Sequence, residues 1–176
     1  QRLAASGIAG EAAAALLGRA PLDLRVNSLK ITREAFTLPE AGEPLAAPAA
    51  LRLPAGTPVE QWEAFEQGRI EVQDHGSQLA CMAVGAQPGE LVVDLCAGAG
   101  GKSLALAAAM ANSGTLIAAD TDRGRLSRLT PRAERAGARI IATTLLDPGR
   151  EMVSLAKLAG RADRVLVDAP CSGTGT

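Results

Sequence analysis

The residues whose types and spacing point most clearly to chemistry form a glycine-rich segment at 94–103, Asp-Leu-Cys-Ala-Gly-Ala-Gly-Gly-Lys-Ser. Glycine lets the backbone approach a ligand closely and adopts positive φ angles without steric cost. Backbone N–H groups at the start of a following helix can then face that ligand. A tight turn between a strand and a helix needs fewer than three glycines in four residues, so this loop is predicted to bind a ligand.

The loop nearly matches two nucleotide-binding sequence patterns, but for each pattern it lacks one essential glycine. A phosphate-binding P-loop would use Gly101-Lys102-Ser103, but the position five residues before Gly101 is Cys96. The dinucleotide fingerprint would begin at Gly98 and requires glycine where the chain has Ser103. The loop also opens with Asp94, whose charge is unfavourable beside a triphosphate.

S-adenosylmethionine suits the same residues better, because it carries no phosphate. It needs an acid at the end of the second strand for its ribose hydroxyl groups, and Asp120 stands there. Asp94 can face the cationic part of the ligand. The residues therefore favour S-adenosylmethionine over either nucleotide.

Alternating strands and helices place these acids on one rim. The predicted strands cover residues 91–95, 114–120, 138–144 and 162–167, and the predicted helices cover 78–87, 102–110, 122–136 and 151–159. This alternation indicates βαβ units with a parallel sheet and right-handed crossovers. Ligands of such sheets bind at the carboxyl ends of the strands, where Asp94, Asp120 and Asp168 stand and Asp147 follows.

The N-terminal third has weaker signals. Residues 1–20 are alanine-rich and predict a helix interrupted by two glycines, and residues 21–27 predict a short extended segment. Residues 38–58 contain five prolines and are predicted to be a loop or linker.

Composition limits the classes of function. Aromatic residues make up 2% of the chain and the net charge is −1, so any binding of nucleic acid must come from local patches rather than a basic protein surface. Three cysteines, Cys81, Cys96 and Cys171, show neither zinc-ligand spacing nor an even count for disulfides. With no apolar run long enough to span a bilayer and no leader pattern, we expect a cytoplasmic protein without a metal site.

The segment after the fourth predicted strand, Asp168-Ala169-Pro170-Cys171-Ser172-Gly173, places a candidate reactive thiol at the same rim. This segment completes a series that resembles the RNA cytosine-5 methyltransferases of the RsmB/Nop/Sun type. The other matching pieces, in the same order as in that family, are 24–27, 68–79, 94–102, 119–120 and Asp147. Together they cover most of the chain.

The resemblance implies a class I, Rossmann-like S-adenosylmethionine-dependent methyltransferase fold, an α/β structure with a parallel sheet and helices on both faces. Residues 1–67 would be part of a small α/β accessory domain that resembles RNA-binding domains, and residues 68–176 the N-terminal part of the catalytic domain. By the same resemblance, Asp120 would hold the ribose, Asp147 would lie near the adenine and Asp168 would lie between the methionine end and the base. The loop residues that would line the cofactor are Cys96, Ala97, Gly98, Ala99, Gly100, Gly101 and Lys102.

The implied reaction transfers a methyl group to carbon 5 of cytosine in RNA, ribosomal RNA being favoured. A thiolate adds to carbon 6 and makes carbon 5 nucleophilic, and a base then removes the carbon 5 proton. In the family the attacking thiol lies in a later Thr-Cys-Ser motif, and the Pro-Cys thiol assists product release, which is the role implied for Cys171. DNA cytosine methyltransferases attack with their Pro-Cys thiol, so Cys171 as nucleophile is the second possibility. Since no Thr-Cys-Ser precedes Thr176, we expect a fragment.

Two other functions remain open from the sequence. One is a P-loop nucleotide hydrolase, and the other is a cofactor-binding module without catalytic activity. Arginines also recur along one face of the predicted third helix, which indicates either a solvated face or a face that contacts phosphates. These are Arg125, Arg128, Arg132 and Arg135.

Overall fold

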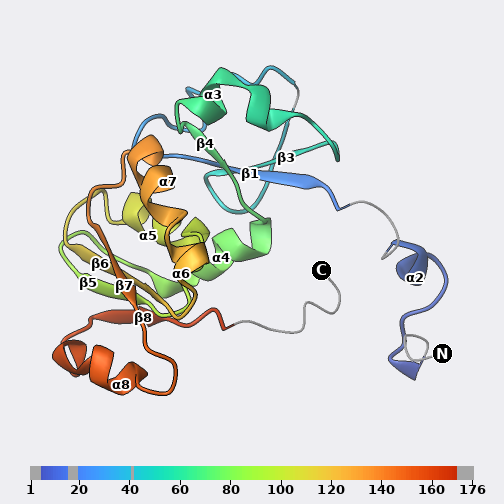
Figure 1. The fold of residues 1–176 in the computed structure, drawn as a ribbon. Helices are drawn as coiled ribbons and strands as arrows, with labels where there is room; N and C mark the ends of the chain where they lie inside the picture. Colours follow the sequence, from blue (N-terminus) through green and yellow to red (C-terminus); the bar gives the residue numbers. More distant parts are fainter. Residues whose placement is uncertain (1–4, 16–19, 41, 170–176) are drawn as a thin grey trace.

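The computed structural model describes residues 5–15, 20–40 and 42–169, and these residues form two four-stranded sheets (Figure 1). The N-terminal sheet is antiparallel, with strand order β2-β3-β1-β4, and the second sheet is parallel, with order β7-β6-β5-β8. Before them, α2 (Glu11–Ala15) lies within the N-terminal stretch predicted to be helical. Within the described ranges, no helix has the length and apolar character needed to cross a membrane.

The N-terminal sheet is built around β1, which confirms the extended segment predicted at 21–27. Its strands and the two short helices beside them are β1 (Leu22–Val26), β2 (Glu43–Pro44), β3 (Ala50–Leu53), β4 (Ile70–Val72), η1 (Val59–Gln61) and α3 (Glu63–Glu66). Leu24 and Val26 of β1 face an apolar core that also holds Ile70. Asp23 and Arg25 point to the opposite face and are also buried, so this strand has no solvated side.

The loop prediction for residues 38–58 was wrong, because this stretch contains β2 and β3. Leu51 and Leu53 of β3 are buried in the core of the N-terminal sheet. Pro48 and Pro54 lie just outside β3, where a missing N–H removes no ladder bond, and Pro44 lies on the edge strand β2. The density of prolines therefore marked the ends of a strand rather than the absence of one.

The parallel sheet and its helices confirm the predicted alternation. Its strands are β5 (Leu91–Asp94), β6 (Thr115–Asp120), β7 (Ile141–Leu145) and β8 (Arg164–Leu166). Its helices are α4 (His75–Val84), α5 (Gly101–Ala109), α6 (Arg123–Leu126), α7 (Leu129–Ala136), α8 (Glu151–Ser154) and η2 (Ala156–Leu158). Helices α4 to α7 cover one face of the sheet and α8 lies on the other (Figure 1). Strand β4 precedes this sheet but pairs with β1, and the proposed domain boundary at 67/68 stays a prediction.

The helix predicted at 122–136 is two helices in the structure, α6 and α7. Asp122 caps the first, as predicted, by accepting a hydrogen bond from the Arg125 N–H at 2.9 Å. Ser127 and Arg128 between them keep helical backbone angles. The hydrogen-bond ladder breaks because Pro131 has no N–H to donate to the Ser127 carbonyl.

The two sheets are held together at the C-terminus of α7. The amide nitrogen of Asn27 donates to the carbonyls of Gly68 and Ala136, both at 2.8 Å, and Asn27 is 1% exposed. The ammonium of Lys30 donates to the Gln67 and Arg135 carbonyls. These side chains satisfy carbonyls that a helix end leaves without intrahelical partners, and they bring α7 against the N-terminal sheet.

Gly100, the residue before α5, packs against Leu129 of α7, and a substitution there tests this contact. Its φ is +85°, and an added Cβ would lie 2.5 Å from Cγ of Leu129. We therefore expect Gly100→Ala to lower the free energy of unfolding by about 2–4 kcal/mol in urea titrations, from overpacking and backbone strain together. Gly101→Ala is the control, because nothing lies within 4 Å of its added Cβ. Equal stability of the two variants would contradict the packing described here.

Candidate functional site

A cavity of about 820 Å³ opens at the carboxyl ends of β5, β6 and β8. Its walls come from the glycine loop, the turn after β6, the start of α8 and the segment after β8. The lining residues are Leu95, Cys96, Ala97, Gly98, Asp120, Thr121, Asp122, Arg125, Leu146, Glu151, Leu155, Val167, Asp168 and Ala169. The cavity lies on the rim where the sequence predicts a ligand, and its volume suits a ligand of nucleoside size.

Asp94 ends the central strand β5 with a buried carboxylate, 1% exposed. One oxygen accepts a hydrogen bond from the Ser103 hydroxyl at 2.7 Å, and the other is buried without a partner in the described part of the chain. Burial raises the pKa of the Asp94 carboxyl, with the nearby charge of Asp168 adding to the effect, while the Ser103 hydrogen bond and the charge of Lys102 oppose it.

The same contacts argue against a P-loop. Ser103 is fully buried and its hydroxyl is bonded to Asp94, so it cannot reach a metal ion in the cavity. The Lys102 ammonium forms an ion pair with Asp168 at 2.6 Å instead of standing free for phosphates. Four carboxylates and one guanidinium line the cavity, a balance that disfavours a polyanion.

Asp120 joins β6 to the glycine loop. One carboxylate oxygen accepts from the Gly98 N–H and the other from the Asp122 N–H, both at 2.8 Å. Gly98 has a φ of +53°, which lets its N–H turn toward this carboxylate. An ionised carboxylate has about four acceptor positions, so Asp120 keeps capacity for hydroxyl groups of a ligand.

The structure brings together some of the predicted site residues. Cys96, Ala97, Gly98, Asp120 and Asp168 line the cavity. Gly101 and Lys102 line an adjoining cavity of about 240 Å³ that shares Cys96, Ala97 and Asp168.

Other predicted residues lie behind or beside the cavity. Gly100 is buried, and the Ala99 carbonyl faces Arg132. Asp147 is exposed and paired with Arg150, while its neighbour Leu146 lines the cavity, so the predicted adenine contact of Asp147 stays a prediction. Cys171 lies outside the described residues.

Burial raises the pKa of two cysteine thiols. It raises the pKa of Cys96, and the charges of Asp120, Asp94 and Asp168 raise it further. Cys81, on the buried side of α4, has a pKa raised to about 11 by burial. Neither has the lowered pKa of a nucleophilic cysteine.

The cavity also contains residues that the sequence analysis missed. Thr121, Asp122 and Glu151 line it because the turn after β6 and the start of α8 reach the same rim. Glu151 begins a predicted helix, and an acid in a first helical turn ordinarily signals only favourable interaction with the helix dipole. The chain offers no signal that would separate this role from a position at the cavity.

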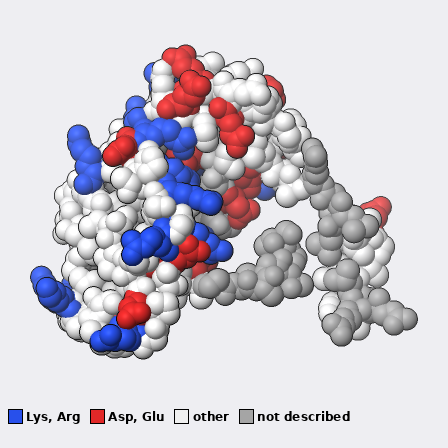
Figure 2. Space-filling view, in the orientation of Figure 1, with Lys and Arg blue, Asp and Glu red and all other residues white. Residues whose placement is uncertain are grey.

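The four arginines of the third predicted helix have different surroundings, and Arg128 is exposed. Arg132 and Arg135 of α7 form ion pairs with the buried carboxylate of Glu71, which was not among the predicted site residues. The interpretation as a solvated face is therefore wrong for these two, while the phosphate-contacting interpretation stays a prediction. Arg125 lies at the cavity and pairs with Asp122. Basic and acidic side chains alternate along the middle of the face shown in Figure 2, without a continuous basic patch.

Comparison with known proteins decides the family. The family model described as 16S rRNA methyltransferase RsmB/F matches residues 81–176, from α4 through the rim residues. The chain belongs to this family.

Relatives extend the likeness to the N-terminal sheet. Ribosomal RNA small subunit methyltransferase B of Citrobacter koseri is 38% identical over 165 residues, covering 89% of this chain and 37% of that protein. The 26S rRNA (cytosine-C(5))-methyltransferase nsun-1 of Caenorhabditis elegans is 36% identical over 163 residues, covering 88% of this chain and 24% of that protein. The chain thus spans well under half of these relatives. The resemblance identified from the sequence is confirmed.

A solved structure shares the fold of this chain. The methyltransferase homolog protein from Pyrococcus horikoshii superposes with a TM-score of 0.77 at 27% identity, over 93% of this chain and 55% of that one. Membership of the RsmB/F family and this likeness confirm the predicted Rossmann-like methyltransferase fold.

Asp94 makes the stability of this RsmB/F domain depend on pH. The pKa of Asp94 in the folded state lies above the ordinary value of 3.8. Between the unfolded and the folded pKa, the folded state therefore binds more protons than the unfolded state, and the free energy of unfolding falls as pH rises through this range. We expect urea titrations between pH about 4 and about 7 to show a relative gain in stability for Asp94→Asn as pH rises. Parallel curves for the variant and the natural sequence would show that Asp94 is not the cause.

Proposed function

We propose that this chain binds S-adenosylmethionine in the rim cavity and takes part in methyl transfer to carbon 5 of cytosine in ribosomal RNA. The observation that carries the proposal is the placing of Asp120 and Asp168 in one cavity with the turn at Gly98. Family membership supports the reaction, and the name of the Caenorhabditis elegans relative supports carbon 5 of cytosine.

The donor set fits this cofactor. Asp120 would accept hydrogen bonds from the ribose hydroxyls, and Cys96, Ala97 and Gly98 would contact the methionine part along the loop backbone. The carboxylates of the rim, with the buried and partly unpaired Asp94 behind them, favour the sulfonium and ammonium charges. When bound, S-adenosylmethionine supplies an electrophilic methyl group.

The chain's own residues would prepare the base. Asp168 stands at the end of β8 beside the loop, and its ion pair with Lys102 fixes the direction of its carboxylate. Asp168 would hold the cytosine at the methyl donor, and Cys171, three residues later, would assist release of product. The attack on carbon 6 would come from a thiol elsewhere in the protein.

Ribosomal RNA is the proposed partner, and the N-terminal sheet is the proposed accessory element that contacts it. The names of the bacterial relatives support ribosomal RNA rather than another RNA. A cytoplasmic location belongs to the same proposal.

The cofactor assignment can be tested by calorimetry. We expect binding of S-adenosylmethionine or S-adenosylhomocysteine and no magnesium-dependent binding of ATP. Asp120→Ala should weaken binding of the cofactor by about 1–3 kcal/mol, because it leaves polar groups of the bound cofactor unpaired.

Asp163→Ala is the matched control. Asp163 also accepts a backbone N–H, that of Leu91 at 2.7 Å, but at the opposite end of the sheet. Its loss should leave cofactor affinity unchanged. Tight ATP binding without binding of either methyl compound would overturn the assignment.

The role of Cys171 is open to a second test, on the protein as its source organism encodes it. If Cys171 assists release, Cys171→Ala still forms the bond to carbon 6 through another thiol and stalls as a covalent RNA adduct. If Cys171 is the nucleophile, the variant forms no adduct, even with 5-fluorocytosine RNA. We expect a slow-migrating band on denaturing gels of variant, labelled RNA and cofactor. Its absence with RNA binding intact would make Cys171 the attacking thiol.

A further inference from the structure

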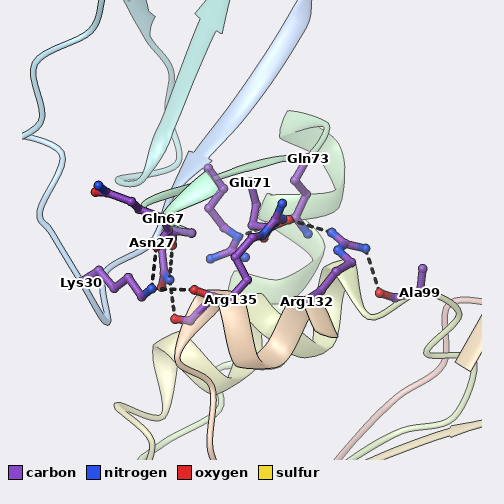
Figure 3. Close-up of polar contacts among 11 residues, drawn as sticks. Asn27, Lys30, Gln67, Glu71, Gln73, Ala99, Arg132 and Arg135 are labelled. Atoms are coloured by element: carbon purple, nitrogen blue, oxygen red, sulfur yellow. Dashed lines mark hydrogen bonds and ion pairs between the residues drawn. The ribbon is translucent and has the colours of Figure 1, made fainter. Parts of the chain in front are cut away.

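The guanidinium of Arg132 connects the N-terminal sheet to the glycine loop (Figure 3). One terminal nitrogen forms an ion pair with the Glu71 carboxylate of β4 at 2.8 Å, and the other donates to the Ala99 carbonyl at 2.8 Å. A single side chain thus contacts a strand of one sheet and the loop of the other.

Glu71 holds Arg132 in this position. Its carboxylate is 2% exposed and accepts from Arg132 with one oxygen and from Arg135 with the other. A buried carboxylate is costly unless it is paired and hydrogen-bonded. Both arginines are therefore held at Glu71, and Arg135 also lies over the ring of Phe65 at 4.1 Å from its centroid.

A second contact reaches the loop from the same sheet. The Gln73 amide donates to the Gly101 carbonyl at 3.3 Å, and its own oxygen accepts from Arg25 of β1 at 2.6 Å. Arg25 and Gln73 are both buried. The two contacts hold carbonyls on either side of Gly100.

We propose that Arg132 is a positioning residue that orders the glycine loop for its ligand, with Glu71 orienting Arg132. The cofactor part of this inference rests on the proposed function. Gly98 and Gly100 both have positive φ, and glycine-rich backbone has more conformational freedom to lose than other residues. A hydrogen bond to the Ala99 carbonyl fixes the peptide plane that joins Ala99 to Gly100, so that less ordering remains for the ligand to impose.

Arg135 provides the matched control for an experiment. Like Arg132 it belongs to α7 and pairs with Glu71, but its side chain has no bond to the loop among the described contacts. Arg132→Met and Arg135→Met each leave Glu71 with one arginine. Only Arg132→Met also releases the Ala99 carbonyl.

The first measurement is hydrogen–deuterium exchange of the ligand-free protein. We expect amides at 98–102 to exchange roughly threefold to tenfold faster in Arg132→Met than in Arg135→Met, the scale of one net hydrogen bond. The second is calorimetry with S-adenosylhomocysteine, where Arg132→Met should lose affinity by a similar factor and Arg135→Met should not.

Arg132→Lys separates the effect of the positive charge at residue 132 from the effect of contacting Glu71 and the Ala99 carbonyl together. A lysine can keep the ion pair with Glu71, but it lacks the planar fork that reaches two partners at once. We expect it to unfold like the natural sequence in urea while its loop exchanges faster. Equal loop exchange in Arg132→Met, Arg132→Lys and Arg135→Met would overturn the inference. If exchange differs as expected but no variant binds the methyl compound, the positioning role stands and the proposed cofactor fails.

Discussion

The carboxylate of Glu71 is the interaction on which the arrangement of the two sheets depends. It is almost fully buried between β4 and α7, where an unpaired charge would be strongly destabilising. The two arginines that neutralise it come from the other half of the chain. The N-terminal sheet and α7 must therefore dock in one orientation, and Asn27 and Lys30 complete that docking at the carbonyls that end α7.

A second buried carboxylate, Asp94, has a different physical status. Glu71 has a charged partner at each oxygen, whereas Asp94 has one hydroxyl partner and one buried oxygen without a partner in the described residues. The raised pKa of Asp94 records this incomplete stabilisation. Paired carboxylates hold a fold together, while an incompletely paired one at the rim of a cavity favours a cationic ligand.

The parallel sheet could be predicted from the sequence because its signals are local. Strands β5 and β6 are short and mostly apolar, and the acids that end them mark the rim directly. The β3 strand could not be predicted this way, because its four residues lie between prolines and their burial depends on distant partners. The pairing of Arg132 and Arg135 with Glu71 was missed for the same reason, since a charged residue is ordinarily solvated and only tertiary structure brings these three together.

The glycine loop shows how one motif can serve separate constraints. Gly98 needs a positive φ so that its N–H can reach Asp120. Gly100 needs the absence of a side chain because Leu129 packs against it. Gly101 has neither a positive φ nor a neighbour within 4 Å of an added Cβ, so the fold itself does not explain it. Two of the three glycines thus follow from contacts within the protein, and the shape of the loop does not need a phosphate to account for it.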